Sequence, residues 1–204
     1  PSWQVAMNEL SNHDHSRFLT RTNHKVGRTN TLGPQAAEQG INKAVFREGV
    51  VIQMTWTGAP TIYYGDEAGV CGFTDPDNRR TYPWGHEDQV LLAFHKDIIR
   101  LRRENEELRS GSLKMLESDY NFISYGRFNR KGQCAVLINN NNHPITKEIH
   151  VWEIGTPKTG KMKVILQSRD DGYCMEGAEY EIKAGKILIE MPQTSATILK
   201  FIEE

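Results

Sequence analysis

The period of the hydrophobic pattern changes near residue 110, and this change limits the folds that the chain can adopt. Before residue 110, apolar side chains recur at helical spacing through residues 36–56 and 91–108, and a short strand-like run precedes each helix, at residues 4–10 and 61–64. After residue 110, short alternating or apolar runs are separated by turn residues. The first half therefore predicts the alternating strands and helices of a parallel sheet or barrel, and the second half predicts a small antiparallel β-sandwich.

Individual elements follow from the same pattern. Asp88 is placed to cap the second helix, and in the predicted strand 122–128 the side chains of Ile123, Tyr125 and Arg127 share one face. The first half holds two strand–helix units, whereas a closed barrel takes eight units and about 250 residues, so we expect the chain to be the tail of a longer protein. The other predicted strands of the second half are residues 134–138, 147–151, 162–166, 186–191 and 196–201.

The charges of the chain nearly cancel, because 25 Lys and Arg stand against 26 Asp and Glu in 204 residues. This balance argues against nucleic acid or a membrane surface as a partner and leaves neutral ligands such as sugars open. No apolar run approaches the ~20 residues of a membrane span. Cys71, Cys134 and Cys174 are widely spaced, which favours a reducing, cytoplasmic location over a disulfide framework. A signal peptide removed ahead of Pro1 would leave no trace in these residues.

Residues 12–17, Asn-His-Asp-His-Ser-Arg, crowd ionisable side chains just after the first predicted strand. A metal site is one interpretation, but it would need three or four converging ligands, and His24 is the one other histidine nearby. A solvated loop in which Asp14 caps a turn is a second interpretation. An active site is the third, because βα folds carry their active sites at the C-terminal ends of their strands.

A second group of polar residues follows the strand predicted at residues 61–64. The loop at residues 75–80 supplies Asp75, Arg79 and Arg80, and Trp84 comes soon after. Carboxylates accept hydrogen bonds from sugar hydroxyls, and the arginine side chain donates them in a fixed fork. Trp84 could stack on a sugar ring or pack within the protein. Together with residues 12–17, this pattern suits a polyhydroxylated neutral ligand.

Three motifs, in order, resemble the α-amylase family of glycoside hydrolases. Residues 12–17 (NHDHSR) resemble its fourth conserved region, and residues 58–69 (GAPTIYYGDEAG) resemble its last barrel strand. Residues 75–84 (DPDNRRTYPW) resemble a loop of the neopullulanase, cyclomaltodextrinase and maltogenic amylase subgroup. The resemblance implies an α/β part followed by an all-β part. Residues 1–109 would be the last two βα units of a TIM (β/α)8 barrel, from strand 7 to helix 8, and residues 110–204 a C-terminal antiparallel β-sandwich.

The resemblance also implies roles for single residues. Asp14 matches the family's third catalytic carboxylate, which binds the reacting sugar and stabilises the transition state, and His13 matches a histidine that hydrogen-bonds the same sugar. Arg17 fits the same motif and is predicted to bind substrate. Asp75 and Arg79 match a pair that lines the donor side of the cleft in the subgroup. The expected ligand is an α-glucan or maltooligosaccharide. No metal or cofactor is predicted; calcium, where the family uses it, is bound mostly by residues outside this segment.

The implied reaction is retaining hydrolysis of an α-glucosidic bond, which needs a carboxylate nucleophile and a carboxylic general acid about 5–5.5 Å apart. In the family these residues stand in a Gly-x-Arg-x-Asp motif and at the end of an apolar run that closes with Glu. Neither pattern occurs in this chain. We therefore expect the chain to be inactive alone. We also expect the missing N-terminal barrel portion, or self-association, to cover its strand edges and apolar helix face.

Two rival interpretations remain open. The β-sandwich could be a carbohydrate-binding or structural module that uses aromatic side chains, although aromatic residues on alternating strands usually pack in a core. An unrelated open α/β hydrolase-like domain is the other alternative, but the chain has no Gly-x-Ser-x-Gly elbow and no phosphate-binding glycine loop. The aromatic candidates of the module are Tyr120, Phe122, Tyr125, Trp152 and Tyr173.

Overall fold

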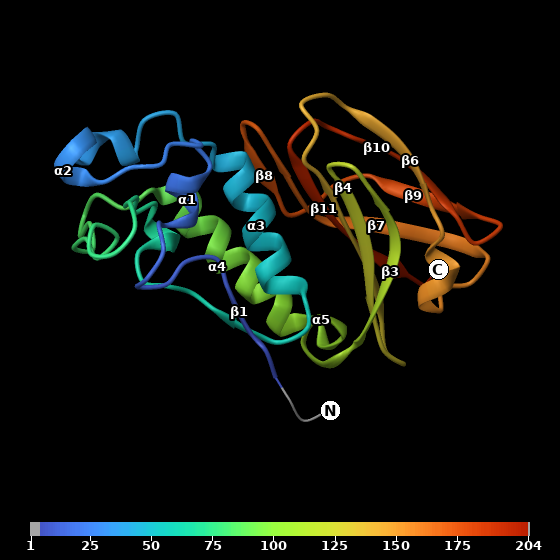
Figure 1. Cartoon of the computed structure of the whole chain (residues 1–204). Coiled ribbons are helices and arrows are strands. Elements are labelled where there is room, and N and C mark those ends of the chain that lie inside the picture. Colours follow the sequence, from blue (N-terminus) through green and yellow to red (C-terminus); the bar gives the residue numbers. More distant parts are fainter. Residues whose placement is uncertain (1–4, 204) are drawn as a thin grey trace.

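The first half of the chain forms two strand–helix units in the computed structural model, which describes residues 5–203. Strand β1 (Met7–Glu9) pairs in parallel with β2 (Ala59–Thr61). Helix α3 (Lys43–Thr55) lies between them in the chain, and α4 (Gln89–Glu104) follows β2 and packs against α3 (Figure 1). The parallel pairing confirms the α/β class predicted for this half. Residue 4 of the predicted first strand lies outside the described residues.

Shorter helical segments connect these elements, and side-chain caps set the bounds of the two long helices. The helix predicted from residue 36 begins only at Lys43, because the Asn42 side chain accepts hydrogen bonds from two backbone N–H groups of the first turn. Asp88 caps α4 in the same way, as predicted. No helix within residues 5–203 has the length and apolar character needed to cross a bilayer. The shorter segments are α1 (Phe18–Arg21), α2 (Thr29–Leu32), the 3-10 helices η1 (Pro34–Ala37) and η2 (Asp66–Ala68), and α5 (Glu106–Ser110).

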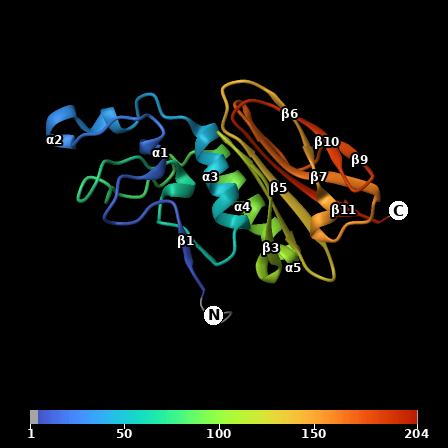
Figure 2. The same cartoon turned by 45° about the vertical axis from the view of Figure 1, so that its right-hand side comes forward.

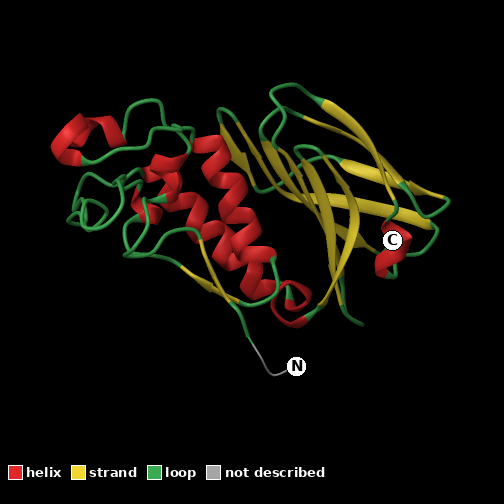
Figure 3. Cartoon of the chain, viewed as in Figure 1, coloured by secondary structure: helices red, strands yellow, loops and turns green. Residues whose placement is uncertain are grey.

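The second half forms a β-sandwich (Figure 3). Its larger sheet contains seven strands in the order β3-β4-β5-β11-β7-β8, with β9 paired to β7, and its smaller sheet pairs β10 with β6. These pairings are antiparallel, as predicted. The bounds are β3 (Ser112–Asp119), β4 (Phe122–Phe128), β5 (Gln133–Asn139), β6 (Ile145–Ile149), β7 (Thr159–Arg169), β8 (Gly172–Cys174), β9 (Glu179–Lys183), β10 (Ile187–Met191) and β11 (Ser195–Ile202).

Most of the predicted strands of this half coincide with observed ones, and β4 has the predicted bounds. The strand predicted at residues 147–151 begins instead at Ile145, and it ends at Ile149 because Val151 already starts the 3-10 helix η3 (Val151–Ile154). In the first half, β2 likewise begins at Ala59, before the predicted residue 61. Strands β3, β8 and β9 were missing from the prediction.

The larger sheet has a hydrophobic core on each face, because side chains alternate along its strands. On β5, Val136 and Ile138 join the core formed with α3 and α4, whereas Ala135 and Leu137 join the core shared with β6 and β10. Figure 2 shows the two helices on one side of this sheet and the smaller sheet on the other. Because the first core contains residues of both halves, the helices and the sandwich are packed as one body.

Helix α3 is buried on almost its entire circumference, yet it carries the buried polar residues Arg47, Glu48, Gln53 and Thr55. Arg47 donates hydrogen bonds to carbonyl oxygens after β7, and Gln53 Nε2 donates to a carbonyl oxygen of β2 at 2.7 Å. The Thr55 hydroxyl lies 2.6 Å from the hydroxyl of Tyr125 on β4. Glu48 Oε1 and Arg47 Nε are buried without a hydrogen-bond partner within residues 5–203.

Glu48 makes the stability of the chain depend on pH. Burial, together with the negative charge of Asp170, raises the pKa of Glu48 from 4.5 to about 8. The folded chain therefore holds a proton that the unfolded chain releases at lower pH. We expect the free energy of unfolding to fall as pH rises from about 5 to about 8, with a slope of up to about 1.4 kcal/mol per pH unit, and then to level off.

Urea unfolding of wild type and Glu48→Gln at several pH values within this window checks the expectation. The variant carries a neutral amide at every pH, so its stability should decline less steeply than that of the wild type. Asp66 contributes a decline of the same sign to both proteins, and the difference between them isolates Glu48. Parallel profiles would contradict the assignment.

Candidate functional site

The loop that follows β1 is shaped by the side chain of Asn12. Its Oδ1 accepts hydrogen bonds from the backbone N–H of Asp14 at 2.9 Å and of His15 at 3.1 Å, which closes a turn of the kind that asparagine favours. Its Nδ2 donates to Glu9 Oε1 at 2.6 Å. The asparagine of the motif thus holds the loop in shape at the C-terminal end of the strand, where the sequence predicts an active site.

The loop at residues 74–80 is bonded to this first loop through backbone carbonyl oxygens. Asn78 is fully buried, and its Nδ2 donates to the carbonyl oxygens of Asn12 at 3.1 Å and of His15 at 2.6 Å. The Thr74 hydroxyl donates to the carbonyl oxygen of Asp14 at 2.8 Å. These bonds join residues that are 60 to 66 positions apart in the sequence, so the two loops are neighbours in space.

Four of the predicted site residues lie on the surface of these two loops. The side chains of His13 and Asp14 are 63% and 65% exposed, and His13 Nε2 lies 3.4 Å from Asp14 Oδ1. On the second loop, Arg79 Nε lies 2.6 Å from Asp75 Oδ1. The structure thus presents two carboxylates, an imidazole and a guanidinium to solvent on adjoining loops, which is a set able to hydrogen-bond sugar hydroxyls.

Arg17, the fifth predicted residue, lies on the inner side of the same region. It is fully buried, and its Nε donates to the Asn78 carbonyl oxygen at 2.9 Å. Its Nη1 donates to the Tyr64 carbonyl oxygen at 2.7 Å and to Asp66 Oδ1 at 2.9 Å. These contacts tie the residues after β1 to those after β2 and to the second loop. They give Arg17 a structural role, while direct contact of Arg17 with substrate stays a prediction.

Asp66 is the buried counter-ion of Arg17. Burial raises the pKa of Asp66 to about 6, and this rise is opposed by hydrogen bonds from the Ser11 hydroxyl and from Arg17 and by the positive charge of Arg17. The carboxyl therefore remains mostly ionised at neutral pH because its partners offset the cost of removing it from water.

Sequence reasoning missed Asn78 and Asp66 as residues that organise the site. Both lie inside the quoted motifs, but the motifs do not indicate that these side chains point inward.

Trp84 is 79% exposed, and its ring centroid lies 4.5 Å from that of Tyr82. Within residues 5–203 no group of three or more His, Cys, Asp or Glu side chains is arranged to hold a metal ion.

The aromatic residues of the alternative binding module divide into two groups. Phe122 and Tyr125 are buried in the cores of the sandwich, and Tyr173 donates a hydrogen bond to Asp97 on α4 at 2.7 Å. Tyr120 and Trp152 are exposed. Three of the five aromatic candidates, Phe122, Tyr125 and Tyr173, thus pack in or against a core, as aromatic residues on strands usually do.

Comparison with known proteins adds a family, relatives and solved structures. The family model described as "Alpha amylase, catalytic domain" matches residues 2–109. An amylopullulanase of Thermoanaerobacter thermohydrosulfuricus is 32% identical over 98% of this chain, and neopullulanase 2 of Thermoactinomyces vulgaris is 32% identical over 96%. The chain spans 13% and 29% of the lengths of these two relatives.

Solved structures share the fold. The α-amylase of Geobacillus thermoleovorans, crystallised with acarbose, superposes with a TM-score of 0.77 at 20% identity, covering 98% of this chain and 39% of that one. A cyclomaltodextrinase superposes with a TM-score of 0.71 at 24% identity, covering 97% of this chain and 30% of that one. The likeness extends over the helical half and the sandwich together, and it confirms the predicted fold class.

We expect Arg17→Met to destabilise the chain by about 3–5 kcal/mol, because it leaves the Asp66 carboxylate buried without its counter-ion. Urea unfolding at pH 7 measures the loss. Arg79→Met is the matched control, since its ion pair with Asp75 is half exposed and should contribute at most about 1 kcal/mol. Equal losses in the two variants would show that Arg17 does not organise the region.

Proposed function

Because the chain belongs to the α-amylase family of glycoside hydrolases, we propose that residues 12–14 and 75–79 form part of the substrate cleft of an α-glucan hydrolase. The observation that carries the proposal is the bonding between the two loops. Thr74 and Asn78 bond the loop that carries Asp75 and Arg79 to the loop that carries His13 and Asp14, which supports a shared role of these four side chains. The loops follow the C-terminal end of a parallel strand, where barrels carry their catalytic residues.

In this proposal Asp14 is the carboxylate that stabilises the transition state. Its negative charge opposes the positive charge that develops on an oxocarbenium-like sugar, and its oxygens accept hydrogen bonds from sugar hydroxyls. His13 lies beside it and hydrogen-bonds the same sugar. Asp75 and Arg79 contact a sugar further along the chain, the carboxylate as acceptor and the guanidinium as donor. Arg17, beneath them, holds the loops in position.

The substrate class in this proposal is an α-glucan or maltooligosaccharide. The names of the relatives support it, since an amylopullulanase, a neopullulanase and cyclomaltodextrinases all match the greater part of this chain. Residues 1–109 serve as the C-terminal portion of the barrel and residues 110–204 as the sandwich domain, with the boundary inside α5. The nucleophile and the general acid come from outside the 204 residues, because the chain contains neither of their motifs.

The purified 204-residue chain should therefore show no glycosidase activity. Without a nucleophile the covalent route is closed, and without the general acid the leaving group stays unprotonated. Release of reducing sugar from cyclomaltodextrin, pullulan and maltooligosaccharides measures this. Activity above the blank that survives repurification would contradict the assignment of the missing carboxylates.

In a polypeptide that also carries the nucleophile and the acid, Asp14→Asn should lower kcat by about 10²–10³-fold, because the lost charge acts in the transition state. Asp75→Asn should chiefly raise KM, since it removes a contact that is made equally before and during reaction. Steady-state kinetics separates the two effects, and Asp171→Asn, in an exposed turn after β7, is the control. An Asp14→Asn variant with unchanged kcat would overturn the proposed role.

A further inference from the structure

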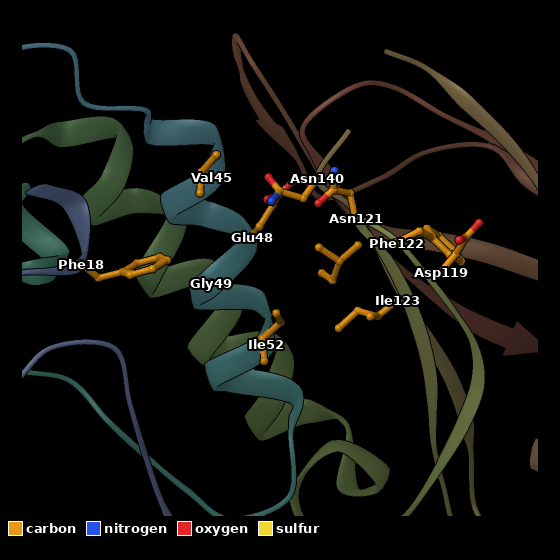
Figure 4. A pocket seen from close by; sticks show the side chains of 11 residues that line it. Phe18, Val45, Glu48, Gly49, Ile52, Asp119, Asn121, Phe122, Ile123 and Asn140 are labelled. Carbon is orange, nitrogen blue, oxygen red and sulfur yellow. The ribbon is translucent and has the colours of Figure 1, made fainter. Parts of the chain in front are cut away.

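A cavity of about 280 Å³ lies between helix α3 and the larger sheet. Figure 4 shows Glu48 gathered with Asn121 and Asn140 at one end of it, and Ile52 and Ile123 at the other. One end of the cavity is therefore polar and the opposite end is apolar. This is the usual character of a small-molecule site, which buries an apolar body and orients it with a few polar groups.

Glu48 is the one polar side chain of the lining that is buried, with 4% of its surface exposed. Its Oε1 is inaccessible to solvent and has no hydrogen-bond partner within residues 5–203. A buried carboxyl oxygen without a partner costs free energy, and its presence in a folded protein calls for an explanation. Arg47 and Gln53, the neighbouring buried polar residues of α3, each donate at least one hydrogen bond, although Arg47 Nε also lacks a partner.

The charges around Glu48 favour a cation. Asp119, at the end of β3, also lines the cavity, and Asp170, in the turn after β7, is close enough to raise the pKa of Glu48. The lining includes no Lys or Arg among the described residues. Two carboxyl groups thus line the cavity and a third lies nearby; Asp119 is paired with Lys147, so Glu48 is the carboxyl of the lining that is left for a cationic ligand.

The nearby basic side chains are bonded to other groups. Lys147 lies 2.9 Å from Glu117 and 3.2 Å from Asp119, so it serves two carboxylates that lie on β3. The guanidinium of Arg47, next to Glu48 on α3, donates to carbonyl oxygens after β7. Neither cation reaches Glu48 Oε1.

We propose that this cavity binds a small organic monocation, a primary ammonium on a short aliphatic or cyclic body, with the carboxylate of Glu48 as its counter-ion. The side-chain oxygens of Asn121 and Asn140 accept hydrogen bonds from the same ammonium group. The aliphatic body lies against Ile52 and Ile123. This site is independent of the proposed α-glucan cleft, since none of its lining residues belongs to the two loops.

Binding is coupled to loss of a proton. Glu48 is mostly protonated at neutral pH, whereas the bound ammonium requires the carboxylate. The neutral carboxyl and the ammonium cation therefore give an ion pair and one proton, which passes to the buffer. Because the ionised fraction of Glu48 rises from pH 7 to pH 9, the apparent affinity should rise about tenfold between these values.

Isothermal titration of the 204-residue chain with cyclohexylammonium chloride tests the proposal. Cyclohexylammonium stays charged through pH 9, and cyclohexanol is the neutral ligand of matching shape. We expect one-to-one binding of the cation, about tenfold tighter at pH 9 than at pH 7. Titration at pH 7 in phosphate and in MOPS, whose ionisation enthalpies differ, should show release of close to one proton per cation bound. Cyclohexanol should bind at least tenfold more weakly at pH 9.

Two variants assign the effect to Glu48. Glu48→Gln, which keeps the shape of the side chain, should weaken binding of the cation at least tenfold at pH 9 and abolish proton release at pH 7. Glu104→Gln, at an exposed position on α4, should leave both unchanged. Thermal melts establish that the variants are folded. The proton count and the comparison with cyclohexanol use the wild type alone, so they decide the question even if Glu48→Gln is poorly folded. No binding, equal binding of cyclohexanol, or binding without proton release would overturn the proposal.

Discussion

The burial of helix α3 is the constraint on which the rest of the structure depends. The helix lies between α4 and the larger sheet, so the backbone carbonyl oxygens at its C-terminal end cannot be left to water. Arg102 on α4 donates to the Met54 carbonyl oxygen at 2.7 Å, and Arg127 on β4 donates to that of Thr55. The end of one helix is thus satisfied from both layers that cover it. The helical half and the sandwich depend on each other for this reason, although the hydrophobic pattern of the sequence divides at residue 110.

The same principle accounts for the arrangement of the proposed cleft. A buried arginine below the loops satisfies carbonyl oxygens that follow both parallel strands, and a buried asparagine satisfies those of the loop after β1. The exposed side chains above them pair within their own loops, His13 with Asp14 and Arg79 with Asp75. Some buried side-chain atoms still lack a hydrogen-bond partner among the described residues, including Arg17 Nη2, Asn78 Oδ1 and Glu48 Oε1. Glu48 is the residue for which a ligand is proposed.

Much of the fold could be predicted from the sequence because apolar residues recur along it with the spacing that buried helices and strands require. The continuous apolar run in β5 reflects a strand with a core on each face, and the Asp88 cap follows from the needs of a helix N-terminus. β3 was missed because it is an edge strand whose burial does not alternate, and β8 is too short to show a period. In these elements the neighbouring strand, not the local pattern, determines the structure.

The site was predicted less completely than the fold, because a motif names residues without giving their direction. Asp14 and Asp75 are predicted to bind the ligand, and their side chains are exposed; their contact with a ligand stays a prediction. Arg17 belongs to the same motif as Asp14 but lies fully buried beneath it. Whether an arginine meets a sugar or a carbonyl oxygen depends on the path of a loop about 60 residues away, which local sequence does not encode.

The loop at residues 74–80 separates two tasks between neighbouring positions. Thr74 and Asn78 grip the backbone of the loop after β1, while Asp75 and Arg79, one residue further along in each case, face solvent. Substitutions of Thr74 or Asn78 would remove the hydrogen bonds of these two side chains and loosen the loop. In the proposed cleft, a substitution of Asp75 or Arg79 would instead change the groups offered to a ligand while Thr74 and Asn78 still fix the position of the loop.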